Sequence, residues 1–129
     1  MIIRIAAEAF GIVNFMEFAS KQVKPSEKIL DAGAGDRRYK KYFFHARYEA
    51  TDFKDVLDNF FTDIFNHSSK IKYDFICSLD KISKPNGSYD AIINTQVLEH
   101  VEYPQKVINE FYRILKPGGK LFLTTPHTV

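Results

Sequence analysis

Short apolar runs alternate with longer amphipathic stretches along the chain. The runs are rich in β-branched and aromatic residues and are bounded by Gly, Pro, Asn, Asp or Ser, a pattern that is typical of strands. They predict strands at 28–31, 47–52, 73–77, 89–94 and 120–125. The first run, KILD, leads directly into two closely spaced glycines, which favours a buried strand followed by a sharp turn.

Between these runs, apolar residues recur at helical spacing. The predicted helices cover 3–22, a short segment with Tyr39, Phe43 and Phe44 on one face, 54–69, and a segment around 107–115. The last is the clearest, because Val107, Phe111 and Ile114 lie at positions i, i+4 and i+7 and the helix-breaking sequence KPGG follows at 116–119.

Strands that alternate with helices predict an α/β fold with a doubly wound parallel sheet, whose ligand crevice lies at the carboxyl ends of the strands. We assign residues 1–24 to an N-terminal helix that flanks or lids the core, and residues 25–129 to the sheet domain. A chain of 129 residues is long enough for one such core.

Composition excludes several classes of protein. The chain has 18 Lys and Arg against 16 Asp and Glu, a net charge of +2, so we expect no nucleic-acid partner. Its single cysteine, Cys77, lies in an apolar run and is expected to be a buried, inert thiol. Charged residues such as Arg4 and Glu8 interrupt the apolar N-terminal stretch, so we expect no membrane span and a cytoplasmic location.

The segment KILDAGAGDRR, residues 28–38, carries the main candidate chemistry. Gly33 and Gly35 leave backbone N–H groups free and no side chain in the way, so the main chain can approach a nucleoside-bearing cofactor closely. Asp31 would supply a fixed acceptor at the end of its strand. Asp52 ends the second strand 21 residues later, near the roughly 20-residue spacing at which dinucleotide folds place a ribose-binding acid.

Four motifs together resemble the class I S-adenosylmethionine-dependent methyltransferases, over about residues 28–126. They are ILDAGAG at 29–35, the acid Asp52, NGSYDAIINTQVLEHV at 86–101 and FYRILKPGGKLFLTTP at 111–126. The resemblance implies a Rossmann-like methyltransferase core, S-adenosylmethionine as the cofactor, and an acceptor that is a small molecule of unidentified structure.

The resemblance also implies a role for each matching residue. The methionine half of the cofactor would lie against Asp31, Ala32, Gly33 and Gly35. Asp52 would accept hydrogen bonds from the ribose hydroxyls, and the adenine would lie against Phe53, Ser78 and Leu79. The sulfonium end would face Asn94, Thr95 and Gln96.

Two positions depart from the family pattern. Arg37 stands where a third small residue is common, and Ser78 stands where an acid commonly follows the third strand, Asp80 being the nearest acid. A serine hydroxyl still accepts a hydrogen bond from the adenine amino group, so we expect cofactor binding to survive with weaker affinity.

Some similar methyltransferases bind a divalent metal through a Glu-x-x-Glu-His pattern after the fourth strand. Here Gln96 replaces the first glutamate, and an amide is a poor substitute for a carboxylate on a hard cation. We therefore expect no metal, with Glu99, His100 and the later His127 as the alternative ligands. His100 is the candidate catalytic base, needed only for a protonated acceptor.

The family's domain continues past the fifth strand with further helices and two more strands, normally an antiparallel pair, and this chain ends at Val129. We therefore expect a partial domain, without the C-terminal antiparallel strands, that binds cofactor without full activity. The strand at 120–125 would then be an open sheet edge, through which copies of the chain would self-associate.

Two other functions stay open. One is a non-catalytic domain that binds S-adenosylmethionine or acts as a scaffold. The other is an NAD(P)-dependent oxidoreductase, although its G-x-G-x-x-G turn would need Gly or Ala at position 38, where Arg38 stands.

Overall fold

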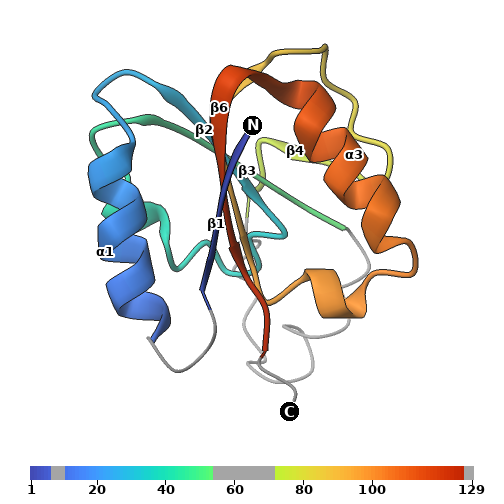
Figure 1. Cartoon of the computed structure of the whole chain (residues 1–129), viewed down its shortest axis with the longest axis horizontal. Coiled ribbons are helices and arrows are strands. Elements are labelled where there is room, and N and C mark those ends of the chain that lie inside the picture. The colour runs from blue at the N-terminus through green and yellow to red at the C-terminus, as the bar shows by residue number, and fades with distance from the viewer. Residues whose placement is uncertain (7–10, 54–71, 127–129) are drawn as a thin grey trace.

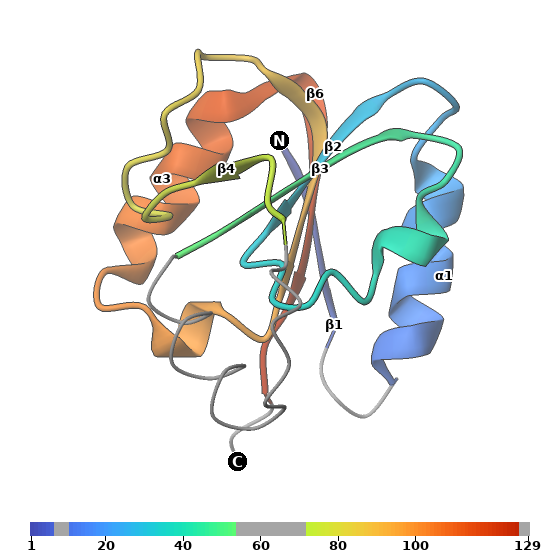
Figure 2. The same cartoon turned by 180° about the vertical axis from the view of Figure 1, so that it is seen from behind.

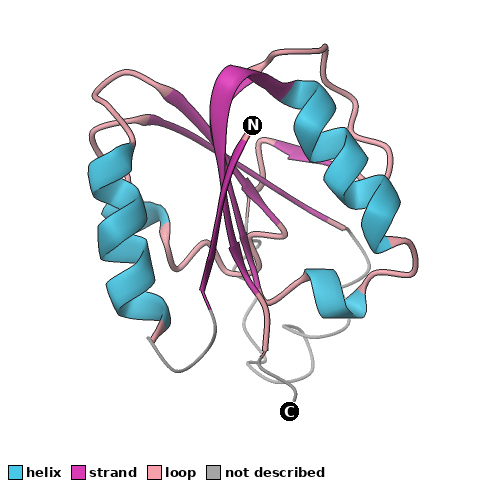
Figure 3. Ribbon diagram, in the orientation of Figure 1, coloured by secondary structure: helices cyan, strands magenta, loops and turns pink. Residues whose placement is uncertain are grey.

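The computed structural model describes residues 1–6, 11–53 and 72–126, and in them the chain forms a six-stranded parallel sheet (Figures 1 and 3). The order across the sheet is β1-β6-β5-β2-β3-β4. The strands are β1 (Ile2–Ala6), β2 (Lys28–Ala32), β3 (Arg47–Asp52), β4 (Phe75–Ile76), β5 (Tyr89–Thr95) and β6 (Leu115–Thr124). Every strand pair is parallel, which confirms the predicted α/β sheet; no antiparallel strand occurs in these ranges.

Helix α1 (Ile12–Gln22) covers one face of the sheet and helix α3 (Pro104–Ile114) covers the other, as the two opposite views in Figures 1 and 2 show. Alternate residues of each strand serve the two cores, because side chains along a strand point to opposite faces. Ile29 packs in the cluster with α1, and its neighbour Leu30 packs in the cluster with α3. Of the helices described, none is long and apolar enough to cross a membrane.

The register places the carboxyl ends of the central strands side by side. Asp31 of β2 lies opposite Ala50 of β3 on one side and Ile93 of β5 on the other. Strand β3 has the predicted bounds, and β5 extends the predicted strand by one residue, to Thr95. The strand ends at which the sequence predicts a ligand crevice therefore lie side by side.

The predicted helix over 3–22 is wrong in its first part. Residues 2–6 form strand β1, which pairs in parallel with β6 from Ile2 opposite Lys120 to Ala6 opposite Thr124. Helix α1 begins only at Ile12, after Gly11, which has a left-handed φ of 71°. The β-branched run in IIRIA favours a strand once a partner is present, and pairing across more than a hundred residues is invisible to local periodicity.

Strand β1 also changes the interpretation of the sheet edge. The outer side of β6 is paired with β1, so the predicted open edge at 120–125 does not exist. Self-association through that edge loses its structural basis, because the N–H and C=O groups it needs are already bonded.

Three smaller predictions also need correction. The segment around 39–44 forms only a 3₁₀ turn, η2 (Lys40–Tyr42), in which Phe43 is buried but Phe44 is 80% exposed. Strand β4 is shorter than the predicted 73–77, and β6 begins at Leu115, with residues 116–119 bulging out between the pairs Tyr89–Leu115 and Ala91–Lys120. The helix predicted at 54–69 lies outside the described residues.

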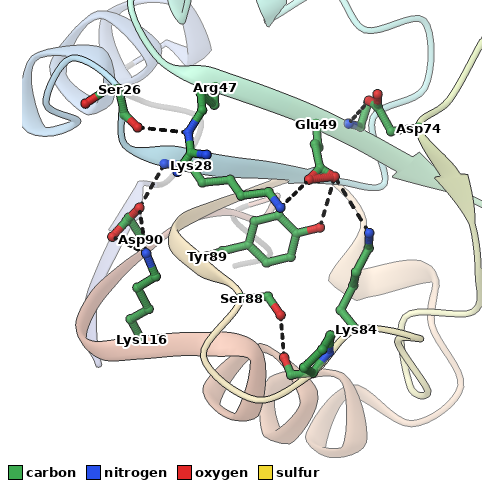
Figure 4. Close-up of polar contacts among 12 residues, drawn as sticks. Ser26, Lys28, Arg47, Glu49, Asp74, Lys84, Ser88, Tyr89, Asp90 and Lys116 are labelled. Atoms are coloured by element: carbon green, nitrogen blue, oxygen red, sulfur yellow. Dashed lines mark hydrogen bonds and ion pairs between the residues drawn. The ribbon is translucent and has the colours of Figure 1, made fainter.

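A polar cluster centred on Glu49 joins the amino-terminal halves of three strands (Figure 4). The Lys28 ammonium lies 2.8 Å from one Glu49 oxygen, and the Tyr89 hydroxyl donates to the other at 3.4 Å. Lys84 approaches the same oxygen as Tyr89, at 3.9 Å. Lys28 begins β2, Tyr89 begins β5 and Glu49 lies in the middle of β3. The cluster therefore links these three strands on the side of the sheet away from their carboxyl ends.

Candidate functional site

The turn after β2 is built on two glycines with left-handed backbone angles, Gly33 (φ 78°) and Gly35 (φ 56°). The Gly33 N–H and the Ala34 N–H both donate to the Thr51 carbonyl at 3.0 Å, which ties the turn to the end of β3. A Cβ at Gly33 would lie 2.5 Å from the Val97 side chain. The first glycine is therefore required by both its angle and its packing, and the turn is held between β3 and the segment after β5.

Asp52 faces this turn from the end of β3. Its Oδ2 accepts a hydrogen bond from the Gly35 N–H at 2.8 Å, and its Oδ1 accepts one from the Phe53 N–H at 2.7 Å. On the other side of the turn, the Tyr73 hydroxyl donates to the Gly35 carbonyl at 2.5 Å. These bonds fix the carboxylate while leaving lone pairs free on each oxygen, because a carboxylate has about four acceptor positions.

Asp31 is buried, with 1% of its surface exposed, and the Tyr48 hydroxyl donates to its Oδ2 at 2.5 Å. Burial raises the pKa of Asp31 to about 7; the Tyr48 hydrogen bond opposes the rise, and the negative charges of Asp52 and Asp36 add to it. No Lys or Arg forms an ion pair with Asp31 in the part of the chain that the structure describes. The site thus holds an acid that lacks a positive partner.

A pocket of about 380 Å³ lies beside the ends of β3 and β4. One wall contains the predicted residues Asp52, Phe53, Ser78 and Leu79. The rest of the lining comes from the segment between β5 and α3 and from Val107 of α3. The full lining is Asp52, Phe53, Ser78, Leu79, Asp80, Val97, His100, Val101, Glu102, Tyr103 and Val107. Its volume falls in the range of about 300–1,000 Å³ that is usual for small-molecule sites.

The polar groups at one end of this pocket are linked to each other. The Ser78 hydroxyl donates to Asp80 Oδ1 at 2.5 Å, so the acid missing from position 78 is supplied two residues later. Leu79 is buried, whereas the Phe53 ring is 48% exposed and free to lie along a flat ligand. The pocket combines a carboxylate, an aromatic ring and aliphatic walls.

At the end of β5, three consecutive side chains each bury a polar atom that has no hydrogen-bond partner among the described residues: Asn94 Oδ1, Thr95 Oγ1 and Gln96 Nε2. The other end of the Asn94 amide is fixed, because its Nδ2 donates to the Ala32 carbonyl at 2.8 Å. Buried polar atoms without partners are uncommon in folded proteins, and a functional role is one explanation for them.

The sequence-predicted residues fall into two groups. Asp52, Phe53, Ser78, Leu79 and His100 line the pocket. The others lie next to it at the ends of β2 and β5 without lining it; they are Asp31, Ala32, Gly33, Gly35, Asn94, Thr95 and Gln96.

His100 and the alternative metal ligands are placed as follows. The His100 side chain is 78% exposed, and its Nε2 lies 3.6 Å from Glu99 Oε1. In residues 1–6, 11–53 and 72–126, no three His, Cys, Asp or Glu side chains gather in a group that would hold a metal ion. His127 lies outside those ranges.

Sequence reasoning missed Tyr48, Tyr73 and, apart from His100, the part of the pocket lining that residues 97–107 supply. Tyr48 carried a signal in principle, because it lies two residues before Ala50, the partner of Asp31, and therefore on the same face of the sheet. Tyr73 reaches Gly35 from the start of the β4 segment, and no local pattern marks that contact.

An adenosine-bearing ligand with a cationic end fits these residues. A Cβ at Gly35 would meet nothing within 4 Å among the described residues, so the turn is open where a ligand would approach. The unpartnered oxygens of Asn94 and Thr95, together with the buried acid Asp31, suit a positive group, and the pocket suits a flat apolar one.

Comparisons with known proteins agree with this arrangement. A family model described as a methyltransferase domain matches residues 5–128. A ubiquinone biosynthesis O-methyltransferase of Xanthomonas axonopodis pv. citri is 30% identical over 115 residues, an alignment that covers 85% of this chain and 48% of that protein. The chain thus spans about half the length of this curated relative.

Two solved structures share the fold. The YcgJ protein of Bacillus subtilis superposes with a TM-score of 0.68 at 18% identity, over 86% of this chain and 50% of that one. A phosphoethanolamine N-methyltransferase of Haemonchus contortus, solved with phosphomonomethylethanolamine and S-adenosylhomocysteine, superposes with a TM-score of 0.66 at 18% identity. The match covers 88% of this chain and 28% of that one.

Proposed function

Because this chain belongs to the methyltransferase domain family, we propose that it binds S-adenosylmethionine across the carboxyl ends of β2 to β5, within a protein that methylates a small molecule. The observation that carries the proposal is the pairing of Asp52 with the Gly35 N–H. One carboxylate, held by the glycine turn, lines a pocket of suitable size. Its free lone pairs suit two neighbouring hydroxyls, which a ribose supplies.

The adenine would occupy the pocket beside Asp52. Phe53 and Leu79 supply apolar surface for the two faces of the ring, and burial of such surface is the main source of affinity for a purine. Ser78 and Asp80 would accept hydrogen bonds from the adenine amino group, because both have oxygen atoms and both line the pocket. We therefore assign Asp80 to the adenine end, in addition to the residues named from the sequence.

The amino-acid and sulfonium end would lie over the glycine turn and the end of β5. Asp31 would balance its positive charge, and Asn94 and Thr95 offer unpartnered oxygens there. When bound, S-adenosylmethionine supplies an electrophilic methyl group, which an acceptor atom takes with its own lone pair while the carbon–sulfur electron pair stays on sulfur. The chain's own residues act mainly by alignment and by excluding water.

His100 is the residue that we propose as a base when the acceptor carries a proton. It lines the pocket from the segment after β5, and its Nε2 lies near the Glu99 carboxylate.

Isothermal titration of the 129-residue chain tests the proposal. We expect saturable binding of S-adenosylmethionine and S-adenosylhomocysteine and no binding of NAD⁺. Asp52→Asn should lower the affinity for S-adenosylhomocysteine at least about tenfold, which corresponds to about 1.4 kcal/mol, because a charged acceptor is lost. Asp90→Asn is the matched control, since Asp90 lies at the amino end of β5, away from the site, and pairs with Lys116.

The same titration separates the other candidate functions. Binding of NAD⁺ without binding of S-adenosylhomocysteine would favour the oxidoreductase and overturn the proposal. Binding of S-adenosylhomocysteine without methyl transfer to any of the small molecules tested would leave a binding or scaffolding domain.

A further inference from the structure

Gln96 immediately follows β5 and has two unusual features. Its backbone is left-handed, with φ 57°, a conformation that costs a side-chain-bearing residue free energy and that clusters at functional sites; Ser26 and Arg37 share it. Its side-chain Nε2 is buried without an acceptor in the described part of the chain. A strained residue that buries an unused donor is costly on both counts, which points to a ligand that accepts from it.

The backbone around Gln96 is rigidly held. The Gln96 N–H donates to the Thr124 carbonyl at 3.0 Å and approaches the Thr124 hydroxyl at 3.1 Å, so the residue is fastened to the end of β6. Gln96 therefore stands between the ends of β5 and β6. Two neighbouring oxygens, Asn94 Oδ1 and Thr95 Oγ1, precede it on β5.

The order of the strands places Gln96 on the acceptor's side of the site. The sheet runs β6-β5-β2-β3-β4, and the adenosine end of the proposed cofactor lies at β3 and β4. Its methyl end then lies over β2 and β5, and an acceptor that lines up behind the methyl group enters from the β5 and β6 side. This step rests on the proposed function.

We propose that Gln96 holds the methyl acceptor by donating a hydrogen bond from Nε2 to its reacting atom, and that this atom is therefore an oxygen. A hydroxyl oxygen has two lone pairs, so one attacks the methyl carbon while the other accepts from Gln96. A neutral amine nitrogen has a single lone pair, which the reaction itself consumes. An amine at this position would leave the Gln96 donor unpaired in a buried site.

The proton balance is consistent with a hydroxyl acceptor. As the oxygen–carbon bond forms and the carbon–sulfur bond breaks, the hydroxyl proton passes to the base, for which we proposed His100, or is already absent from a phenolate.

Two matched probes, phenol and aniline, test the inference, because they have the same shape and differ in the reacting atom. The ¹⁵N-labelled chain is first saturated with S-adenosylhomocysteine, then titrated with each probe while the side-chain NH₂ signals of Gln96 are followed by NMR. We expect phenol to bind about three- to tenfold more tightly than aniline and to shift the Gln96 signals, as one hydrogen bond predicts.

Three variants complete the experiment. Gln96→Met removes the amide at similar size, and Gln96→Gly removes it while relieving the left-handed strain, so at least one variant is expected to fold. Gln105→Met is the control, because Gln105 lies on the exposed face of α3 and pairs with Asn109. The preference for phenol should vanish in both Gln96 variants and persist in the control.

The outcomes separate the two proposals. If the chain fails to bind S-adenosylhomocysteine, the proposed function fails and this inference falls with it. If S-adenosylhomocysteine binds normally but aniline equals or exceeds phenol, or the phenol preference survives in both Gln96 variants, the role of Gln96 is overturned while the proposed function stands.

Discussion

The hydroxyl of Tyr48 donates a 2.5 Å hydrogen bond to the buried carboxylate of Asp31, joining β3 to β2 beneath the glycine turn. A neutral donor relieves only part of the cost of burying this acid, and the pKa of Asp31 is about 7. Tyr39, Asp36 and Asp52 also face this group, and Arg37 lies close enough to act on Tyr48. The pair is thus suited to receive a cation.

The first prediction concerns stability against pH. A folded-state pKa of about 7, raised from 3.8, favours folding most at low pH, and this contribution is lost as the pH rises through 7. From pH 5 to pH 8 the loss is roughly 3 kcal/mol, at about 1.4 kcal/mol per pH unit up to the pKa. Urea unfolding at both pH values should show Asp31→Asn lacking this loss and more stable than the wild type at pH 8.

If the free energy of unfolding of Asp31→Asn falls with pH as steeply as that of the wild type, the pKa of Asp31 is not raised and the prediction is wrong. The same variant should bind S-adenosylmethionine poorly at pH 8, because it lacks the negative charge. A variant that is more stable than the wild type but binds the cofactor more weakly is expected when the acid serves ligand binding and destabilises the fold.

The second prediction concerns Tyr48. Its hydrogen bond lowers the pKa of Asp31, so Tyr48→Phe should raise that pKa further and move the pH at which S-adenosylmethionine binding weakens toward higher values. Titration calorimetry from pH 6 to pH 9 measures this midpoint. Tyr89→Phe is the control, because Tyr89 bonds to Glu49 at the far end of the sheet; a midpoint that moves equally in both variants would refute the prediction.

The third prediction compares two glycines. Gly35 and Gly118 both have left-handed φ angles and open space around a Cβ among the described residues, so alanine should cost each about 1 to 2 kcal/mol of stability. Only Gly35→Ala places a methyl group over the proposed site. We expect it to lose S-adenosylhomocysteine affinity about tenfold or more, while Gly118→Ala binds normally. Equal affinities in calorimetry would place the ligand elsewhere.

The fourth prediction separates the fold from the site. Glu49→Gln should lower the free energy of unfolding by about 1 to 2 kcal/mol, because the half-buried Lys28 loses its charged partner. Affinity for S-adenosylhomocysteine should not change, since the cluster lies toward the amino ends of the strands (Figure 4). A large loss of affinity at unchanged stability would contradict this division. Asp36→Asn removes the exposed ion pair with Arg38 and should change the free energy of unfolding by less than about 1 kcal/mol.

Local pattern was sufficient where an element is both strongly periodic and bounded by clear breakers. Strand β3 and the core residues of α3 follow directly from the sequence, and parallel topology brings Gly35 and Asp52 together, as their hydrogen bond confirms. Strand β1 was missed because its pairing partner lies more than a hundred residues away, and nothing in IIRIA alone decides between a helix and a strand.

The polar surroundings of the site were harder to foresee. Tyr48 and Tyr73 reach the glycine turn across strands, and their contacts depend on register rather than on spacing in the chain. The left-handed angle of Gln96 is likewise invisible in the sequence, because glutamine rarely adopts it. The roles of such residues can be recognised only once the structure shows which strand ends are neighbours.

A crystal structure of the chain grown with S-adenosylhomocysteine tests the central claim most directly. The account predicts density at the carboxyl ends of β2 to β5, with both ribose hydroxyls on Asp52, the adenine between Phe53 and Leu79, and the amino-acid end over the glycine turn. A ligand bound elsewhere, or a saturated crystal with an empty pocket and the Asp52 carboxylate in contact only with Gly35 and Phe53, would contradict it.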